Sequence, residues 1–199
     1  MVQWFNWPGI KLFFKVARQP ALRVPRLHVG SIAKVPWEKL KRERGIRAIV
    51  LDKDNTFTAP YELTVHCSVK DALDDMVQLF GSDRIAVLSN SAGTRDDKDY
   101  VEAKVVEEAI GLKVIIHDEK KPGGGPDAVL DHFRATNCHI QGNEVRCNHV
   151  AMVGDRLLTD VVYGNLNGMY TILVDPITEK NDNFPAKMIR RIEHKFLLP

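Results

Sequence analysis

Five short apolar runs rich in β-branched residues alternate with four segments of helical periodicity, beginning at residue 46 of the 199-residue chain. The apolar runs are Ile46–Leu51, Ile85–Leu88, Val114–Ile116, Val150–Val153 and Tyr170–Val174. The helical segments are Val69–Leu79, Asp97–Ile110, Pro126–Arg134 and Asp160–Leu166. Strands that are apolar on both faces are typical of parallel sheets covered by helices on both sides. The alternation therefore predicts an α/β fold with a doubly wound parallel sheet of about five strands.

The charge of the chain is divided unevenly along its length. Residues 1–47 contain 11 Lys and Arg against 2 Asp and Glu, whereas the whole chain contains 28 against 26. We therefore expect two parts, a basic and aromatic arm at residues 1–45 and an α/β domain at residues 46–199. A basic arm on an acidic body predicts an anionic partner, either a membrane surface or a nucleic acid. No uninterrupted apolar run reaches the roughly 18 residues that indicate a membrane-spanning helix.

Polar residues follow each of the first four apolar runs, where doubly wound sheets bind their ligands. In chain order the clusters are Asp52 and Asp54; Ser89 and Asn90; Lys120 and Lys121 before three glycines; and Asp155, Arg156 and Asp160 after Gly154. Each cluster alone is also compatible with a polar turn or a helix cap. Together, carboxylates, hydroxyl and amide groups, ammonium groups and further carboxylates predict magnesium-dependent phosphoryl transfer through an aspartyl phosphate.

These motifs resemble those of the haloacid dehalogenase superfamily of phosphatases, over residues 46 to about 175. The four motifs appear as Asp52-Lys53-Asp54-Asn55-Thr56, Ser89, Lys121, and Gly154-Asp155 with Asp160. Four segments look more particularly like the fungal mitochondrial phosphatidylglycerophosphate phosphatase family, namely residues 50–55, 89–93, 97–100 and 153–160. That resemblance implies removal of the terminal phosphate of phosphatidylglycerophosphate, which yields phosphatidylglycerol for cardiolipin synthesis.

The resemblance also implies a role for each matched residue. Asp52 would be the nucleophile and Asp54 the general acid and base, while Ser89 and Lys121 would bind phosphoryl oxygens. The implied Mg²⁺ ligands are Asp52, the main-chain carbonyl of Asp54, and Asp155. Supporting positions behind them are Asp160, which would orient a metal-bound water or Lys121, and Thr56. Asn90 and Arg156 are expected substrate contacts.

The spacing of the motifs leaves no room for a cap domain. About thirty residues separate the first motif from the second strand, and about as many separate Lys121 from the fourth strand. Each interval is mostly consumed by one helix. We therefore expect an open site that suits a substrate too large to enclose, such as a phosphate on a membrane or at the end of a nucleic acid.

Residues 1–18 have the pattern of an amphipathic helix with an aromatic face and a basic face. The residues expected to meet a membrane are Trp4, Phe5, Trp7, Ile10, Lys11, Phe13, Phe14, Lys15 and Arg18. Cations combined with Trp and Phe predict interfacial membrane binding. Two alternatives stay open, a mitochondrial transit peptide and a helix packed on the body of the protein.

The leading interpretation is a peripheral enzyme on the matrix side of the mitochondrial inner membrane, with anionic lipids as partners and no nucleic acid. Its substrate would be phosphatidylglycerophosphate, and its cofactor Mg²⁺. The oligomeric state is left open, and homo-oligomerisation is compatible with the sequence. The alternatives are a soluble or nucleic-acid phosphomonoesterase of the same superfamily, and a non-catalytic scaffold that binds lipid.

Overall fold

The computed structural model describes residues 16, 18–136 and 145–178. Its centre is a six-stranded sheet in which every neighbouring pair is parallel, with the order β1-β6-β5-β2-β3-β4. The strands are β1 (Leu27–Val29), β2 (Ala48–Leu51), β3 (Ile85–Val87), β4 (Lys113–Val114), β5 (Val150–Gly154) and β6 (Tyr170–Val174). The predicted α/β fold with a parallel sheet is therefore confirmed.

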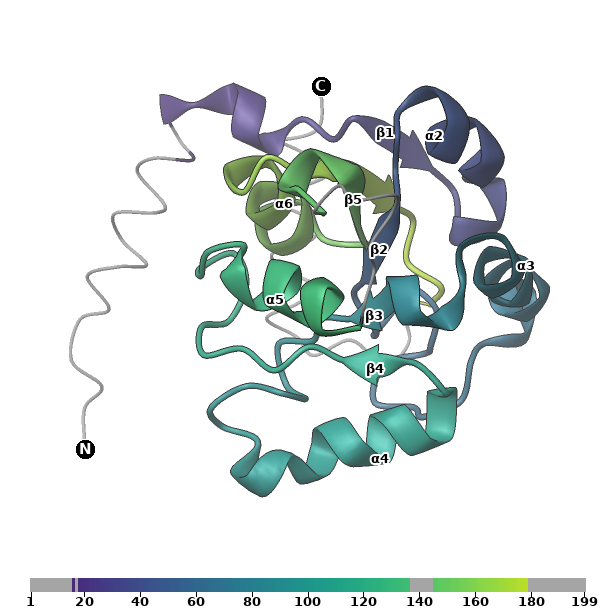
Figure 1. The fold of residues 1–199 in the computed structure, drawn as a ribbon, viewed down its shortest axis with the longest axis vertical. Helices are drawn as coiled ribbons and strands as arrows, with labels where there is room; N and C mark the ends of the chain where they lie inside the picture. The colour runs from purple at the N-terminus through teal and green to yellow at the C-terminus, as the bar shows by residue number, and fades with distance from the viewer. Residues whose placement is uncertain (1–15, 17, 137–144, 179–199) are drawn as a thin grey trace.

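Helices follow the strands and cover the sheet on both faces (Figure 1). The α-helices are α2 (Trp37–Glu43), α3 (Lys70–Phe80), α4 (Val101–Ile110), α5 (Asp127–Ala135) and α6 (Val162–Leu166). Short 3-10 turns are η1 (Pro20–Arg23), η2 (Ile32–Lys34), η3 (Cys67–Val69), η4 (Ser82–Arg84), η5 (Lys98–Tyr100) and η6 (Cys147–His149). A π-helical turn, η7 (Leu157–Val161), runs directly into α6.

Alternate residues of the strands enter two separate apolar clusters. Ile49 and Leu51 of β2 pack in the cluster that contains α3, whereas Ala48 and Val50 pack in the cluster that contains α5. Figure 1 shows these two helices on opposite sides of the strands. Because side chains alternate between the two faces of a strand, a strand covered on both faces must be apolar at every position. This is why the apolar runs in the sequence are continuous.

The sheet contains one strand more than the five that the sequence predicted. The additional strand, β1, lies within residues 1–45 and pairs with β6 at one edge of the sheet. The chain that follows is also part of the body, since Ile32, Trp37 and Leu40 are buried in the same cluster as β2. The body therefore begins well before residue 46. Strand β1 has only three residues, and the middle one is exposed. Its apolar run is therefore too short to be recognised as a strand from the sequence.

Most predicted elements differ from the observed ones by one or two residues at an end, and three differ in a way that has a local cause. The segment predicted as one helix from Asp97 begins with the 3-10 turn η5, and α4 starts only at Val101. The third strand is Lys113–Val114 rather than Val114–Ile116. The helix predicted from Asp160 begins three residues earlier, as the π turn η7. These differences follow local capping and hydrogen bonding, which apolar periodicity does not report.

The residues between β2 and α3 form no domain of their own. Residues 55–66 contain two isolated bridge contacts of Thr58, with Asp54 and with Val65, before the short turn η3 begins. In the second interval the described residues are taken up by a glycine-rich loop, α5 and η6. Within these described parts of the two intervals, nothing resembling a cap domain is seen.

Most of the predicted membrane-binding arm lies outside the described residues. This holds for Trp4, Phe5, Trp7, Ile10, Lys11, Phe13, Phe14 and Lys15. Arg18 is described and is exposed. Among the helices that the structure describes, none combines the length and the apolar character that crossing a membrane requires.

Candidate active site

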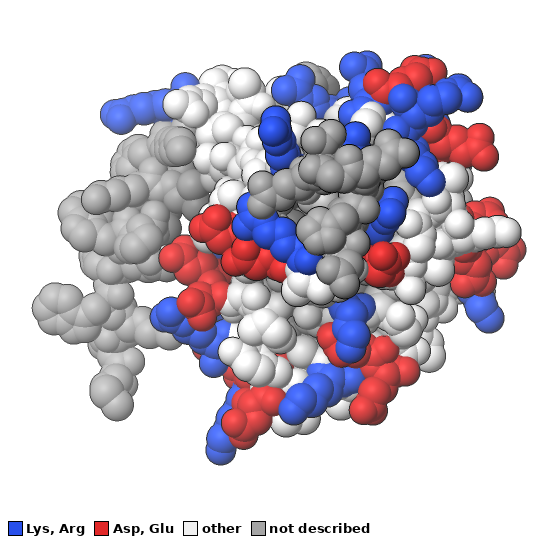
Figure 2. Space-filling view, viewed as in Figure 1, with Lys and Arg blue, Asp and Glu red and all other residues white. Residues whose placement is uncertain are grey.

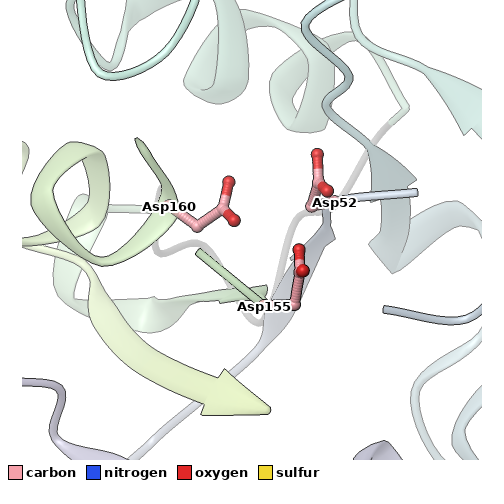
Figure 3. A group of neighbouring side chains, drawn as sticks. All are labelled: Asp52, Asp155 and Asp160. Atoms are coloured by element: carbon pink, nitrogen blue, oxygen red, sulfur yellow. The ribbon is translucent and has the colours of Figure 1, made fainter. Parts of the chain in front are cut away.

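Three carboxylates converge at the carboxyl ends of two neighbouring strands (Figure 3). Asp52 directly follows β2, Asp155 directly follows β5, and Asp160 lies in the turn η7. One oxygen from each lies within 4.8 Å of the others. Asp155 and Asp160 are buried, while Asp52 keeps 15% of its side chain exposed. Asp52 is therefore the member of the group that an incoming substrate reaches.

Lys121 places its ammonium group among these carboxylates. Its Nζ lies 2.7 Å from Oδ1 of Asp52 and 2.6 Å from Oδ1 of Asp160, and its side chain is only 1% exposed. Burial lowers the pKa of Lys121, but the carboxylates of Asp160 and Asp52 outweigh burial and raise this pKa above its ordinary value. Lys121 therefore stays charged and compensates two buried negative charges.

Asp160 reaches this position because residue 154 is a glycine. A Cβ added at Gly154 would lie 2.2 Å from Oδ2 of Asp160, too close for any side chain. The same oxygen accepts a hydrogen bond of 3.1 Å from the main-chain N–H of Arg156. Burial raises the pKa of Asp160 to about 6, with Asp52 acting in the same direction and Lys121 opposing both. Asp160 also contacts Lys121 directly, which is the geometry required by one of the two roles predicted for Asp160.

Asp54 lies beside this group but has different partners. Its Oδ1 contacts Nζ of Lys53 and accepts a hydrogen bond of 3.0 Å from the main-chain N–H of Tyr61. Lys53 is buried and also donates to the carbonyl of Glu62 at 2.9 Å. Sequence reasoning gave Lys53 no role. The sequence does contain a signal for its burial, because Lys53 lies between two aspartates just after a buried strand.

The loop after β3 carries Ser89 and Asn90. Ser89 is buried, and its hydroxyl lies 3.0 Å from the hydroxyl of Ser91. The Asn90 amide faces the main chain of Lys121, with one hydrogen bond in each direction. His117, which the sequence analysis did not single out, lies 2.8 Å from the carbonyl of Ser89 through its Nε2. The second and third motifs are therefore in direct contact.

Two further predicted residues lie close to the carboxylates. Arg156 is half-buried, and its main-chain N–H binds Asp160. Thr56 is 1% exposed, and its hydroxyl oxygen finds no hydrogen-bond partner among the described residues. Its main-chain N–H donates to the carbonyl of Lys53 at 3.3 Å. Thr56 thus belongs to the turn that carries Asp52 and Asp54.

The donor set of this site suits a divalent cation. Hard cations such as Mg²⁺ prefer carboxylate oxygens, and Asp52, Asp155 and Asp160 offer three within 4.8 Å. From the sequence, Asp160 was predicted to support the metal ligands without being one of them. In the structure its carboxylate belongs to the same group as those of Asp52 and Asp155. The carboxylate of Asp54, in contrast, is turned to Lys53 and the Tyr61 N–H.

A partly exposed carboxylate, a buried hydroxyl group, a buried lysine and an acidic pair lie at the carboxyl ends of the parallel strands, which is the arrangement that the resemblance to haloacid dehalogenase phosphatases led us to expect. The chain matches the family model described as mitochondrial PGP phosphatase over residues 8–178, where PGP is phosphatidylglycerophosphate. It belongs to this family.

Curated relatives agree with this assignment. The chain is 40% identical over 171 residues to the chloroplastic and mitochondrial phosphatidylglycerophosphate phosphatase 1 of Arabidopsis thaliana, covering 85% of this chain and 46% of that protein. It is 38% identical to its chloroplastic counterpart from Chlamydomonas reinhardtii, covering 95% of this chain and 66% of that protein. The chain thus spans about half to two thirds of the length of these relatives.

A fungal relative is closer in length. The mitochondrial phosphatidylglycerophosphatase GEP4 of Saccharomyces cerevisiae is 32% identical over 169 residues, which cover 85% of this chain and 86% of that protein. The description of the family and the name of this relative both specify mitochondria. No solved structure matches the chain.

Proposed function

We propose that this chain is a magnesium-dependent phosphatase that converts phosphatidylglycerophosphate to phosphatidylglycerol through an aspartyl phosphate. The observation that carries the proposal is the ammonium group of Lys121, held between Asp52 and Asp160 at 2.7 and 2.6 Å with Asp155 beside them. A fixed cation next to a partly exposed carboxylate suits in-line attack on a phosphomonoester. Family membership supports the lipid substrate.

In the first step, an oxygen of Asp52 forms a bond to phosphorus while the bond from phosphorus to the glycerol oxygen breaks. Asp54 gives its proton to that leaving oxygen. Ser89 and Lys121 bind the phosphoryl oxygens and offset their charge, and Arg156 and Asn90 were the substrate contacts expected from the sequence. Asp52 keeps 15% of its side chain exposed, so the phosphate approaches from that side and the rest of the lipid remains outside.

In the second step, Asp54 takes a proton from water as that water attacks phosphorus. The bond between phosphorus and the Asp52 oxygen breaks, which releases phosphate and restores the carboxylate. Asp54 therefore has to begin the cycle protonated and to exchange its contact with Lys53 for one with the leaving group. Asp52 and Asp155, with Asp160 nearby, would hold a divalent cation, which would supply further charge neutralisation for the phosphoryl group.

We further propose that the protein is peripheral on the matrix side of the mitochondrial inner membrane. The amphipathic pattern of residues 4–18 supports this location. Basic side chains also outnumber acidic ones over α2 on the face shown in Figure 2, where Lys39, Lys41, Arg42 and Arg44 are exposed beside Glu38 and Glu43. Such cations contribute on the order of 1 kcal/mol each near an anionic surface. We propose that these two features together face the lipid.

The test is phosphate release from phosphatidylglycerophosphate in mixed micelles with Mg²⁺. Glycerol 3-phosphate and a 5′-phosphorylated oligonucleotide are measured in parallel. We expect a strong preference for the lipid and no turnover by Asp52→Asn, which circular dichroism should show to be folded. Turnover of only glycerol 3-phosphate or the oligonucleotide would favour the alternative function, a soluble or nucleic-acid phosphomonoesterase of the same superfamily. Binding of lipid without any turnover would favour the non-catalytic scaffold.

A further inference from the structure

The loop that carries Ser89 and the loop that carries Lys121 are tied together by the side chain of Asn90. Its Nδ2 donates to the carbonyl of Lys121 at 3.0 Å, and the N–H of Lys121 donates to its Oδ1 at 2.8 Å. One planar amide thus binds both polar groups of the Lys121 main chain. The two residues are 31 positions apart in the sequence, so this contact fixes one loop against the other.

A second tie runs through His117. Its Nε2 lies 2.8 Å from the carbonyl of Ser89, and its Nδ1 lies 2.8 Å from the carbonyl of Glu119. A neutral imidazole donates to one of these carbonyls and an imidazolium to both. The main-chain N–H of His117 also donates to the carbonyl of Gly93 at 2.9 Å. His117 therefore connects the residues just before Lys121 to the turn around Ser89.

We propose that Asn90 and His117, called here the loop brace, are positioning residues that hold Ser89 and Lys121 at a fixed separation before substrate arrives. This rests on the proposed function, because it takes Ser89 and Lys121 as the groups that bind the phosphoryl oxygens. It gives Asn90 a role different from the direct substrate contact expected from the sequence. Its amide acts through the main chain of Lys121.

The brace matters because lysine has a long and flexible side chain. The ammonium group of Lys121 meets Asp52 and Asp160 only if its main chain stays in place, since its contacts are as short as 2.6 Å. Displacements of about 1 Å at a reacting centre lower rates by about 100-fold. Two hydrogen bonds from the half-buried Asn90 side chain to the main chain of Lys121 supply the required rigidity without occupying the space of the substrate.

The structure offers a matched control at the opposite end of the sheet. Asn165 also ties two segments through its amide, donating to the carbonyls of Leu22 and Val24 at 2.9 and 3.0 Å. Its Oδ1 accepts from the hydroxyl of Thr171 at 3.0 Å. Asn165→Ala therefore removes three hydrogen bonds where Asn90→Ala removes two, and the partners of Asn165 include neither Lys121 nor any of the three carboxylates.

The first measurement is kcat and KM for p-nitrophenyl phosphate with Mg²⁺. For Asn90→Ala we expect kcat to fall by about 10- to 100-fold with KM changed by less than about threefold. Asn90→Asp keeps the acceptor for the Lys121 N–H and loses the donor to its carbonyl, so its kcat should lie between those of Asn90→Ala and the wild type. His117→Ala should also lower kcat, whereas Asn165→Ala should lose thermal stability and keep its kcat.

The second measurement is independent of activity. Amide hydrogen exchange at Lys121, followed by NMR in the metal-free and substrate-free protein, should be slow in the wild type and in Asn165→Ala. It should be at least about tenfold faster in Asn90→Ala, because the acceptor of that N–H is gone. If amide exchange at Lys121 is as slow in Asn90→Ala as in the wild type, the positioning role of the loop brace is overturned.

The outcomes separate the brace from the function on which it rests. If the wild type turns over the ester and Asn90→Ala keeps its kcat within about twofold, the brace is overturned and the proposed function stands. If Asn165→Ala loses kcat as strongly as Asn90→Ala, the effect is general destabilisation and the brace is again overturned. If the wild type hydrolyses no phosphomonoester at all, the proposed function fails, and the positioning role fails with it even where exchange at Lys121 behaves as expected.

Discussion

The two ends of the parallel sheet are both held together by side chains that join distant segments, but by side chains of different kinds. At the amino ends, the neutral amide of Asn165 joins α6 to the chain before β1. At the carboxyl ends, Asp52, Asp155, Asp160 and Lys121 bring charges together with little exposure. Buried charges are expensive even when they are paired, whereas a satisfied amide is not. The difference indicates that the amino end is built for stability and that the carboxyl end gives up stability for chemistry.

Replacing Lys121 should produce the largest effect at the charged end. Lys121→Met leaves the carboxylates of Asp52 and Asp160 without their cation, and breaking a buried pair in this way costs about 3–5 kcal/mol. Urea unfolding at pH 8 in metal-free buffer measures this loss, and added Mg²⁺ should restore part of it if the three carboxylates hold a cation. A loss below about 1 kcal/mol would show that the charges are better solvated than their burial indicates.

Two glycine substitutions should separate the two ends of the sheet. A Cβ at Gly154 would lie 2.2 Å from Asp160, so Gly154→Ala should displace this carboxylate and lower kcat by about 100-fold. A Cβ at Gly164 would lie 2.5 Å from Cγ2 of Thr171, so Gly164→Ala should cost about 1–3 kcal/mol of stability.

For Gly164→Ala, kcat at 20 °C should stay at the wild-type value. Thermal unfolding and steady-state kinetics on both proteins give the comparison. Equal losses of kcat in the two variants would mean that the ends of the sheet are not independent.

Asp97 tests whether every buried charge at the carboxyl end serves catalysis. Its carboxylate accepts hydrogen bonds of 2.9 Å from the N–H groups of Gly93, Glu102 and Ala103, which joins the Ser89 loop to the start of α4. Burial raises the pKa of Asp97, but these N–H groups outweigh burial and lower it below its ordinary value. An acid whose pKa is lowered by folding stabilises the protein above its unfolded-state pKa, and this contribution disappears as the pH falls through the folded-state value.

Asp97→Asn should therefore cost about 1–2 kcal/mol at pH 7, and the difference from the wild type should shrink below about pH 4. Urea unfolding at several pH values between 7 and 2.5 provides the measurement. A difference that stays constant over this range would contradict the assigned hydrogen bonds. Catalytic constants at neutral pH should change far less than in Gly154→Ala.

The smallest effect is expected for an ion pair on the outside of the molecule. Asp131 and Arg134 of α5 lie 2.8 Å apart, but their side chains are 69% and 42% exposed. Exposed pairs three residues apart on a helix contribute about 0.5 kcal/mol or less. Asp131→Ala should stay within that limit in urea unfolding at low salt. A larger loss would weaken the contrast between buried and exposed charge on which the other predictions depend.

The sequence predicted the parts of the site that stand directly at strand ends. Asp52 directly follows one apolar run and Asp155 follows another after a single glycine, so their place at the sheet edge follows from the alternation of strands and helices. The contact of Asp160 with Lys121 was expected, but its membership of the carboxylate group was not. That membership depends on the π turn η7 and on the space left by Gly154, which periodicity does not reveal.

Other features could not be predicted because they depend on distant partners. The role of the Asn90 amide is visible only once the loop of Lys121 lies beside it. Strand β1 is too short to be recognised by its pattern, and its pairing with β6 alone identifies it as a strand. Residue types at strand ends thus predict which side chains gather at the edge of the sheet better than they predict which loops will be in contact.

The position of β1 has a consequence for the order in which the protein is made. Leu27 pairs with Ile172, and 145 residues of chain separate the two. Strand β1 is at the edge of the sheet and contacts β6 as its sheet neighbour, so it has no strand to join until β6 has been synthesised. At about 5–20 residues per second, translation of that interval takes about 7–30 seconds. Among the strands that the structure describes, the first in the chain is thus the last that can enter the sheet.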